Sequence, residues 1–142
     1  MIFTSAERVL VHLLPYAHAR DAGRDATQAG IADGARILRS HVPRTVRALL
    51  QEGLLESREA RLPGKTRRTT VYALTPAGVS RAREILERID RLHTEIDGRA
   101  TNLGDARKTL GLSPLEAVAA EDLGRLGDAA TAVVGLHDHR PV

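Results

Sequence analysis

The sequence predicts an α+β fold that is mainly helical, and three observations carry this prediction. Four segments before residue 93 repeat apolar residues at helical spacing. Between the third and the fourth segment, two β-type runs flank a Pro-Gly turn. Hydrophobic residues make up 42% of the 142 residues, which is typical of a globular chain. We therefore expect helices packed beside one β-hairpin, followed by a small helical C-terminal extension.

The first helix is predicted to begin at Thr4. Thr4 and Glu7 fit a capping box, in which each side chain accepts a hydrogen bond from the backbone amide of the other residue. Apolar residues follow at helical spacing as far as Leu14, and Pro15 limits the helix. Residues 15–26 show no period, so we expect a loop there.

A short helix is predicted next, with Thr27 as its N-cap and its end near Gly34. Gly30 lies inside it and costs up to about 1 kcal/mol of helix stability relative to alanine. Tertiary packing must therefore hold this helix. Ile37 and Leu38 lie in the connection that follows, and we expect both to fill the core.

The third helix is predicted over residues 40–52, with Ser40 as its N-cap and Gly53 at its end. Pro43 sets this register. A proline costs about 3 kcal/mol inside a helix but little in the first turn, where its missing amide has no partner anyway. Arg44 points almost opposite the apolar face, which consists of Val42, Val46, Leu49 and Leu50.

A β-hairpin is predicted from residues 54–61 and 68–75, joined by the turn Leu62-Pro63-Gly64-Lys65. Thr75 then caps a fourth helix, with Pro76 at its first position. The apolar stripe of this helix continues to Leu92, so we place a domain boundary there and expect domains at 1–92 and 93–142.

The C-terminal extension is predicted to hold a small hairpin and short helices. Asp97-Gly98 favours the hairpin, and a continuing helix broken at Gly98 is the alternative. Short helices are expected at residues 103–110 and 113–123, and a last apolar helix at 129–136.

The formal net charge is +3, and its distribution is uneven. Residues 39–72 hold eight basic side chains and three acidic ones, a local net charge of +5. A basic centre in a nearly neutral chain is the electrostatic footprint of a site for a polyanion. Aromatic residues make up only 2% of the chain, so base stacking of the kind that single-strand binders use is nearly excluded.

The sequence lacks the signals of several other classes. It has no cysteine, and its six histidines, His137 and His139 in the tail included, do not predict a metal site or a cofactor. It shows no glycine-rich phosphate loop, nucleophile elbow or spaced carboxylate pair, which argues against an enzyme. It also lacks a signal peptide and any apolar run of about 18 residues, so we expect a soluble cytoplasmic protein that does not enter a membrane.

Three motifs follow one another along the elements predicted above. They are Thr27-Gln28-x-x-Ile31-Ala32 in the second helix, Ser40-His41-Val42-x-Arg44-x-Val46-x-x-Leu49-x-x-x-Gly53-Leu54-Leu55 in the third helix and its exit, and Arg67-Arg68-x-x-x-Tyr72-x-Leu74-Thr75-x-x-Gly78 at the end of the hairpin. In this order they resemble a winged helix-turn-helix of the MarR-like class, most of all the archaeal regulators of that kind, with the third helix as the recognition helix and the hairpin as the wing. The resemblance covers residues 4–92. One departure is Pro43, which stands where many members of the family carry a serine or threonine that contacts a phosphate.

The resemblance implies a sequence-specific transcription regulator that binds double-stranded DNA. Helix 40–52 would then read the major groove, and the wing at residues 62–68 would contact the backbone or the minor groove. Arg44 is the first candidate for a base contact, because its planar guanidinium matches the two major-groove acceptors of guanine. The full set of expected DNA-binding residues is Gln28, Ser40, His41, Arg44, Thr45, Arg47, Lys65, Arg67 and Arg68.

The other members of this set are expected to contact bases or phosphates. His41, Thr45 and Arg47 flank Arg44 on the recognition helix. Ser40 and Gln28 stand at helix starts, where a backbone phosphate is favoured. The three wing cations repel one another, so a counter-anion such as phosphate is expected beside them.

We also expect a homodimer, which would place two recognition helices on half-sites one DNA turn apart, with the helices after Leu92 as its interface. The alternative to a DNA-binding regulator is a winged-helix protein–protein interaction module without DNA binding. In that case the C-terminal segment would present its apolar residues to a partner, namely Leu103, Leu110, Leu115 and Val118.

Overall fold

The computed structural model describes residues 3–19 and 23–124. The helix expected at 129–136 and the histidines of the tail lie outside these residues. The chain divides into two compact units, Met1–Ile85 and Leu86–Val142, and each is described by itself below. Among the described residues, no helix has both the length and the apolar character that crossing a bilayer requires.

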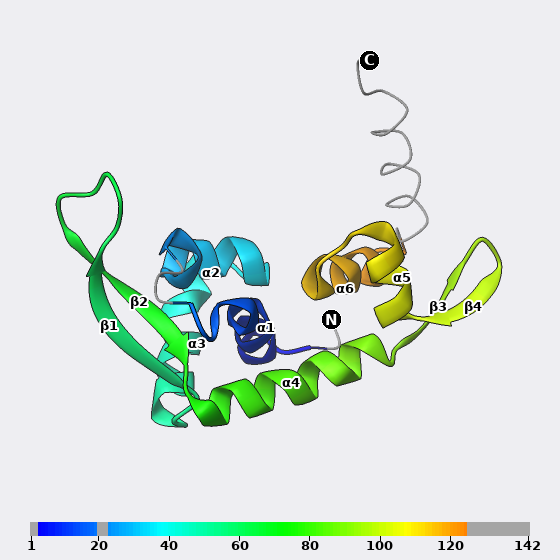
Figure 1. Ribbon diagram of the computed structural model, residues 1–142, viewed down its shortest axis with the longest axis horizontal. Coiled ribbons are helices and arrows are strands. Elements are labelled where there is room, and N and C mark those ends of the chain that lie inside the picture. Colours follow the sequence, from blue (N-terminus) through cyan, green and yellow to red (C-terminus); the bar gives the residue numbers. More distant parts are fainter. Residues whose placement is uncertain (1–2, 20–22, 125–142) are drawn as a thin grey trace, which may run out of the picture. The chain divides into compact units, whose positions relative to one another are not determined.

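The first unit combines three short helices, a two-stranded hairpin and the beginning of a longer helix (Figure 1). In chain order these are α1 (Ser5–Leu13), α2 (Gln28–Ala35), α3 (Val42–Gln51), β1 (Leu55–Arg61), β2 (Arg68–Leu74) and α4 (Pro76–Asp90), whose last residues belong to the second unit. The hairpin extends past the helices of this unit in Figure 1, with its connecting turn at the far end. This is the predicted mainly helical α+β fold with a β-hairpin wing.

The start of α1 confirms the predicted capping box. The Thr4 amide donates to Glu7 Oε1 at 3.0 Å, and the Glu7 amide donates to Thr4 Oγ1 at 3.1 Å. The segment after α1 is more ordered than the expected loop, because its described part contains two 3₁₀ turns, η1 (Leu14–Tyr16) and η2 (Gly23–Ala26). The Tyr16 hydroxyl joins these turns by donating to Asp25 Oδ2 at 3.0 Å.

Gly30 of α2 is a packing requirement that local helix propensity does not reveal. The Thr27 hydroxyl accepts from the Gly30 amide at 3.2 Å, as its predicted N-cap role requires. A Cβ atom at Gly30 would collide with the carbonyl oxygen of Arg24 in η2. At the other end of α2, Arg8 of α1 donates to the carbonyl oxygens of Ala35 and Arg36, so α1 satisfies part of the helix C-terminus.

The predicted start of the third helix is wrong. Ser40 is not an N-cap: α3 begins at Val42, and a 3₁₀ turn, η3 (Arg39–His41), precedes it. The His41 amide donates to the Leu38 carbonyl at 2.9 Å, so this turn satisfies the backbone and no side-chain cap forms. Pro43 then occupies the first turn, as its missing amide requires.

The expectation that Leu38 fills the core is also wrong. Its side chain is 66% exposed, and Ile37 before it is half-buried. The η3 turn carries the backbone around the corner between α2 and α3 at this point, and the core is closed instead by the apolar face of α3, where Val42, Val46 and Leu49 are buried.

The hairpin register runs from Leu55 opposite Leu74 to Arg61 opposite Arg68. At the predicted turn, the Lys65 amide donates to the Leu62 carbonyl at 3.0 Å, and Gly64 has φ of +77°. A proline followed by a glycine with positive φ is the signature of a type II turn, which confirms the prediction. The buried residues of the hairpin lie toward its base and are Leu55, Val71, Tyr72 and Leu74.

The base of the wing is tied to the start of α4. The Thr75 hydroxyl caps this helix by accepting from the Gly78 amide at 3.1 Å, and it donates to the Gly53 carbonyl at 2.7 Å. Gly78 is required here, since a Cβ atom would collide with the Leu54 carbonyl oxygen. The end of α3, the base of the wing and α4 therefore meet at one tightly packed junction.

In the second unit, a hairpin follows the last residues of α4, which confirms the predicted hairpin over the alternative of a continuing helix broken at Gly98. Strands β3 (His93–Ile96) and β4 (Arg99–Asn102) are antiparallel, and Asp97 and Gly98 between them both have positive φ, as a type I′ turn requires. Helices α5 (Leu103–Leu110) and α6 (Pro114–Asp122) follow. The Arg107 guanidinium holds Asp90 through two hydrogen bonds, at 2.8 and 3.2 Å.

Three of the four apolar residues that were expected to face a partner are buried, namely Leu103, Leu115 and Val118, and Leu110 is half-buried. Leu123, after the end of α6, is 66% exposed. The burial of the first three argues against the form of the protein-module alternative that relies on presenting all four side chains.

Replacing Gly30 by alanine tests the contact between η2 and α2. Although alanine is the better helix former, Gly30→Ala is expected to lower the free energy of unfolding by about 1–3 kcal/mol, because the added methyl must displace backbone. Urea unfolding measures this change. Ser80→Ala, at an exposed position of α4, is the control for propensity alone and is expected to gain up to about 0.5 kcal/mol. A gain for Gly30→Ala would contradict the close contact.

Candidate nucleic-acid interface

The exposed face of α3 carries the strongest candidates for base contacts. Arg44 and Arg47 are exposed, because Val42 and Val46 of the same helix are buried on the opposite side. His41, just before the helix, is exposed as well. Thr45 is half-buried, and its hydroxyl donates to the His41 carbonyl at 3.0 Å. That hydroxyl can therefore only accept a hydrogen bond from a ligand.

Ser40 occupies a different position from the one the sequence predicted. It lies in the η3 turn, exposed, between Arg39 and His41, which are exposed too. Arg39 was absent from the predicted set, although its place one residue before the supposed cap made it a near neighbour of the recognition helix. Three consecutive polar side chains thus stand at the entrance to α3.

The far end of the wing concentrates positive charge. Lys65, Arg67 and Arg68 are exposed around the turn, as predicted. The register adds Arg61, which is paired directly opposite Arg68. Like charges opposite each other destabilise a hairpin unless an anion lies between or beside them. Sequence reasoning missed Arg61 because only the register, counted outward from the turn, reveals this pairing.

Most of the exposed cations on α3, at its entrance and on the wing form no ion pair with a described carboxylate. Within residues 3–19 and 23–124, no carboxylate forms an ion pair with any of seven cations, which we call the cationic set. Its members are Arg39, Arg44, Arg47, Arg61, Lys65, Arg67 and Arg68. By contrast, Arg24 pairs with Asp33 at 2.7 Å and Arg81 with Glu84 at 3.1 Å. The unpaired charges leave a positive potential that an external polyanion can neutralise.

Gln28 holds a structural hydrogen bond that the sequence did not predict. Its Nε2 donates to the Tyr72 hydroxyl at 3.0 Å, which links the first turn of α2 to strand β2. Tyr72 is buried and Gln28 is half-buried, so this bond is partly shielded from competing water. The two residues are 44 positions apart, and no local pattern could have paired them.

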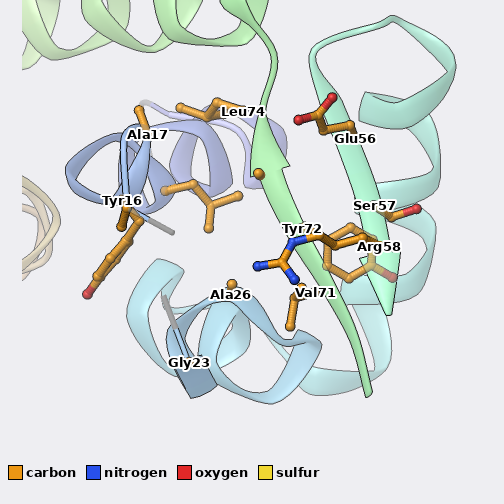
Figure 2. Close-up of a pocket in the computed structure, with 13 residues that line it drawn as sticks. Tyr16, Ala17, Gly23, Ala26, Glu56, Ser57, Arg58, Val71, Tyr72 and Leu74 are labelled. Atoms are coloured by element: carbon orange, nitrogen blue, oxygen red, sulfur yellow. The ribbon is translucent and has the colours of Figure 1, made fainter. Parts of the chain in front are cut away.

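A separate pocket of about 420 Å³ lies on the inner side of the hairpin (Figure 2). Its walls come from α1, the two 3₁₀ turns and both strands, and the Arg58 side chain points into it in Figure 2. Tyr16 lines this pocket. Its hydrogen bond to Asp25, together with desolvation by burial, raises the pKa of the Tyr16 hydroxyl above its ordinary value. None of the nine predicted DNA-binding residues lines this pocket. In the described part of the chain, no group of three or more potential ligands could hold a metal ion.

Comparison with known proteins gives only a distant structural likeness. No family model and no curated protein matches the chain. Solved structures that are similar include ZitR of Lactococcus lactis in complex with DNA, at 18% identity over 90% of this chain and 75% of that one, with a TM-score of 0.48. They also include the MarR family transcription regulator SP03579, at 20% identity over 98% and 77%, with a TM-score of 0.48.

A third similar structure is the zinc-dependent MarR family transcriptional regulator AdcR in its zinc-bound state, at 16% identity over 95% of this chain and 75% of that one, with a TM-score of 0.45. These structures give no support to an archaeal likeness in particular. A likeness at this level says nothing about what this chain binds.

A double-mutant cycle tests the link between Gln28 and Tyr72. Tyr72→Phe and Gln28→Ala are each expected to lower the free energy of unfolding by about 1 kcal/mol, since each removes one partner of the same bond. The double variant should lose less than the sum, with a coupling of about 0.5–1.5 kcal/mol. Tyr16→Phe deletes a hydroxyl that bonds to Asp25 instead, so its cost should add to that of Gln28→Ala. Additive costs for the first pair would contradict the link.

Proposed function

We propose that this chain is a transcription regulator that binds double-stranded DNA sequence-specifically, with α3 in the major groove and the wing on the adjacent backbone or minor groove. The observation that carries the proposal is the cationic set: seven exposed cations that have no carboxylate partner within residues 3–19 and 23–124, on α3, on the turn before it and at one end of the hairpin. A helix with a buried apolar face and an exposed basic face is suited to entering the major groove.

Base reading is assigned to α3. Arg44 can donate two parallel hydrogen bonds to O6 and N7 of guanine. Arg47 and His41 flank it as further donors. Thr45 contributes only an acceptor, because its hydroxyl proton is used by the His41 carbonyl, and it therefore suits an exocyclic amino group of adenine or cytosine.

Backbone contacts are assigned to the wing and to the entrance of α3. Lys65, Arg67 and Arg68 neutralise phosphates, which positions the protein without reading sequence. Ser40 keeps a phosphate role through its exposed hydroxyl alone, since it caps no helix. Gln28 stabilises the contact between α2 and strand β2 of the wing by its hydrogen bond to Tyr72. We assign no catalytic residue, and such a regulator would act in the cytoplasm.

Arg44→Ala and Lys65→Ala should separate base reading from backbone contact. The arginine variant is expected to lose about 1–3 kcal/mol of discrimination at one base pair, whereas the lysine variant should weaken all sequences alike and reduce the salt slope by about one. Selection from random DNA and titrations against salt measure the two effects. Arg83→Ala, an exposed arginine of α4, is the matched control and should change neither.

The wild-type salt slope is the critical measurement for the proposal itself. About six phosphate contacts should give a slope of log K against log salt near −5. A slope near zero would refute DNA binding by the cationic set.

We further propose a homodimer that joins through the residues after Leu92. A two-fold dimer would present two copies of α3 to half-sites about 10 base pairs apart, and the preferred DNA sequence should then be palindromic. Light scattering of the purified protein should report twice the mass of the chain. A monomer at high concentration, or a selected site without two-fold symmetry, would count against the dimer.

A further inference from the structure

A second cavity, of about 720 Å³, lies beside the wing in the first unit. We call it the wing cavity. Its walls come from the start of α2, from the η3 turn and from the end of the hairpin, and they include Gln28, Arg39, Pro63, Lys65 and Thr70. The cavity is therefore lined by side chains from two parts of the proposed interface, the entrance of α3 and the wing.

The charge of the wing cavity is positive only. Arg24, Arg39 and Lys65 line it, and no acidic side chain among the described residues does. Arg24 forms an ion pair with Asp33 at 2.7 Å, and this carboxylate partly neutralises the charge of Arg24. Arg39 and Lys65 are exposed and have no ion pair within the described residues. A cavity with two uncompensated cations and no carboxylate favours an anion over a neutral or cationic ligand.

The remaining walls limit what the anion can be. Threonines, Pro63, Ala29 and Leu62 supply neutral surfaces, and the described lining contains no tryptophan, phenylalanine or tyrosine on which a base could stack. Gln28 forms one wall and is held in place by Tyr72. A compact, hydrogen-bonding anion that needs no aromatic platform fits these walls, and a phosphodiester has this chemistry.

We propose that the wing cavity takes one phosphodiester of the DNA backbone, which Arg39 and Lys65 share. This inference rests on the proposed DNA-binding function and goes further, because it assigns Arg39 to the interface and makes one phosphate a bridge between the wing and the entrance of α3. Arg67 and Arg68, at the exposed side of the turn, contact other phosphates.

The salt dependence of DNA binding distinguishes a shared phosphate from two separate ones. Each phosphate that the protein neutralises contributes about −0.9 to the slope of log K against log salt. Arg39→Ala and Lys65→Ala are each expected to weaken binding about tenfold to a mixed-sequence duplex of about three helical turns. If the phosphate is shared, the double variant loses only the slope of about one unit that Lys65→Ala removes by itself, and its loss of affinity stays well short of the hundredfold product of the single effects.

Two phosphates contacted separately would give a slope loss of about two in the double variant and multiplicative effects on affinity. That result, or an Arg39→Ala variant that binds like the wild type, would overturn the shared phosphate while leaving the proposed function intact. A wild-type chain that does not bind the duplex would overturn both.

Matched controls remove the effect of net charge and of folding. Arg83→Ala and Arg91→Ala each delete one exposed cation; neither residue lines the wing cavity, and both precede the proposed dimer interface. This pair should combine multiplicatively and leave the slope unchanged. Because Arg39 and Lys65 are exposed, thermal unfolding of their variants is expected to match that of the wild type.

Discussion

The burial of one face of α3 is the constraint on which the rest of the interface depends. Val42, Val46 and Leu49 are at most 2% exposed, and α3 contacts α1, α2 and β1. Each of these side chains stabilises the fold by roughly 1.5–3 kcal/mol when it is buried. Turning the helix would bury Arg44 and Arg47 instead, at a cost of several kcal/mol for each charge. The orientation of the basic face is therefore set by the core and not by any contact that the arginines make.

The wing depends on the same core through its base. Leu55 and Leu74 are buried there, Thr75 bonds to Gly53, and Gln28 bonds to Tyr72. These anchors stabilise the hairpin at one end and leave the other end free to carry cations. The hairpin can therefore tolerate Arg61 opposite Arg68, a pairing that opposes its own stability. A surface that is unfavourable in the free protein is favourable for binding an anion, since the ligand removes the repulsion.

Local signals predicted much of this fold. The capping box of α1, the Pro-Gly turn of the wing and the Asp-Gly turn of the second hairpin all formed as expected. Each depends on residues within about four positions, so tertiary context has little opportunity to override it. The outward direction of Arg44 followed as well, because it needs only the helical period and the positions of the apolar residues.

The failures share a different cause. Ser40 has the chemistry of an N-cap, yet η3 satisfies the same backbone group by a main-chain bond, and α3 begins two residues later. Leu38 is apolar, yet it lies on the outside of the corner that η3 makes. Glycine has a low helix propensity, so Gly30 is expected to destabilise α2, yet the nearby Arg24 carbonyl leaves no room for a side chain at this position. In each case a neighbouring element decided the outcome.

The sequence by itself determined the type and order of the elements, the turns that join the strands and the concentration of positive charge between residues 39 and 72, because these properties depend on residue identity and short spacing. Only the tertiary structure decided which of those charges lie together: Arg39 and Lys65 line one cavity, and Arg61 is paired opposite Arg68. It also decided that Gln28 donates a hydrogen bond to Tyr72. The physical reason is distance along the chain: these contacts join residues brought together by packing and strand register, and no local pattern encodes them.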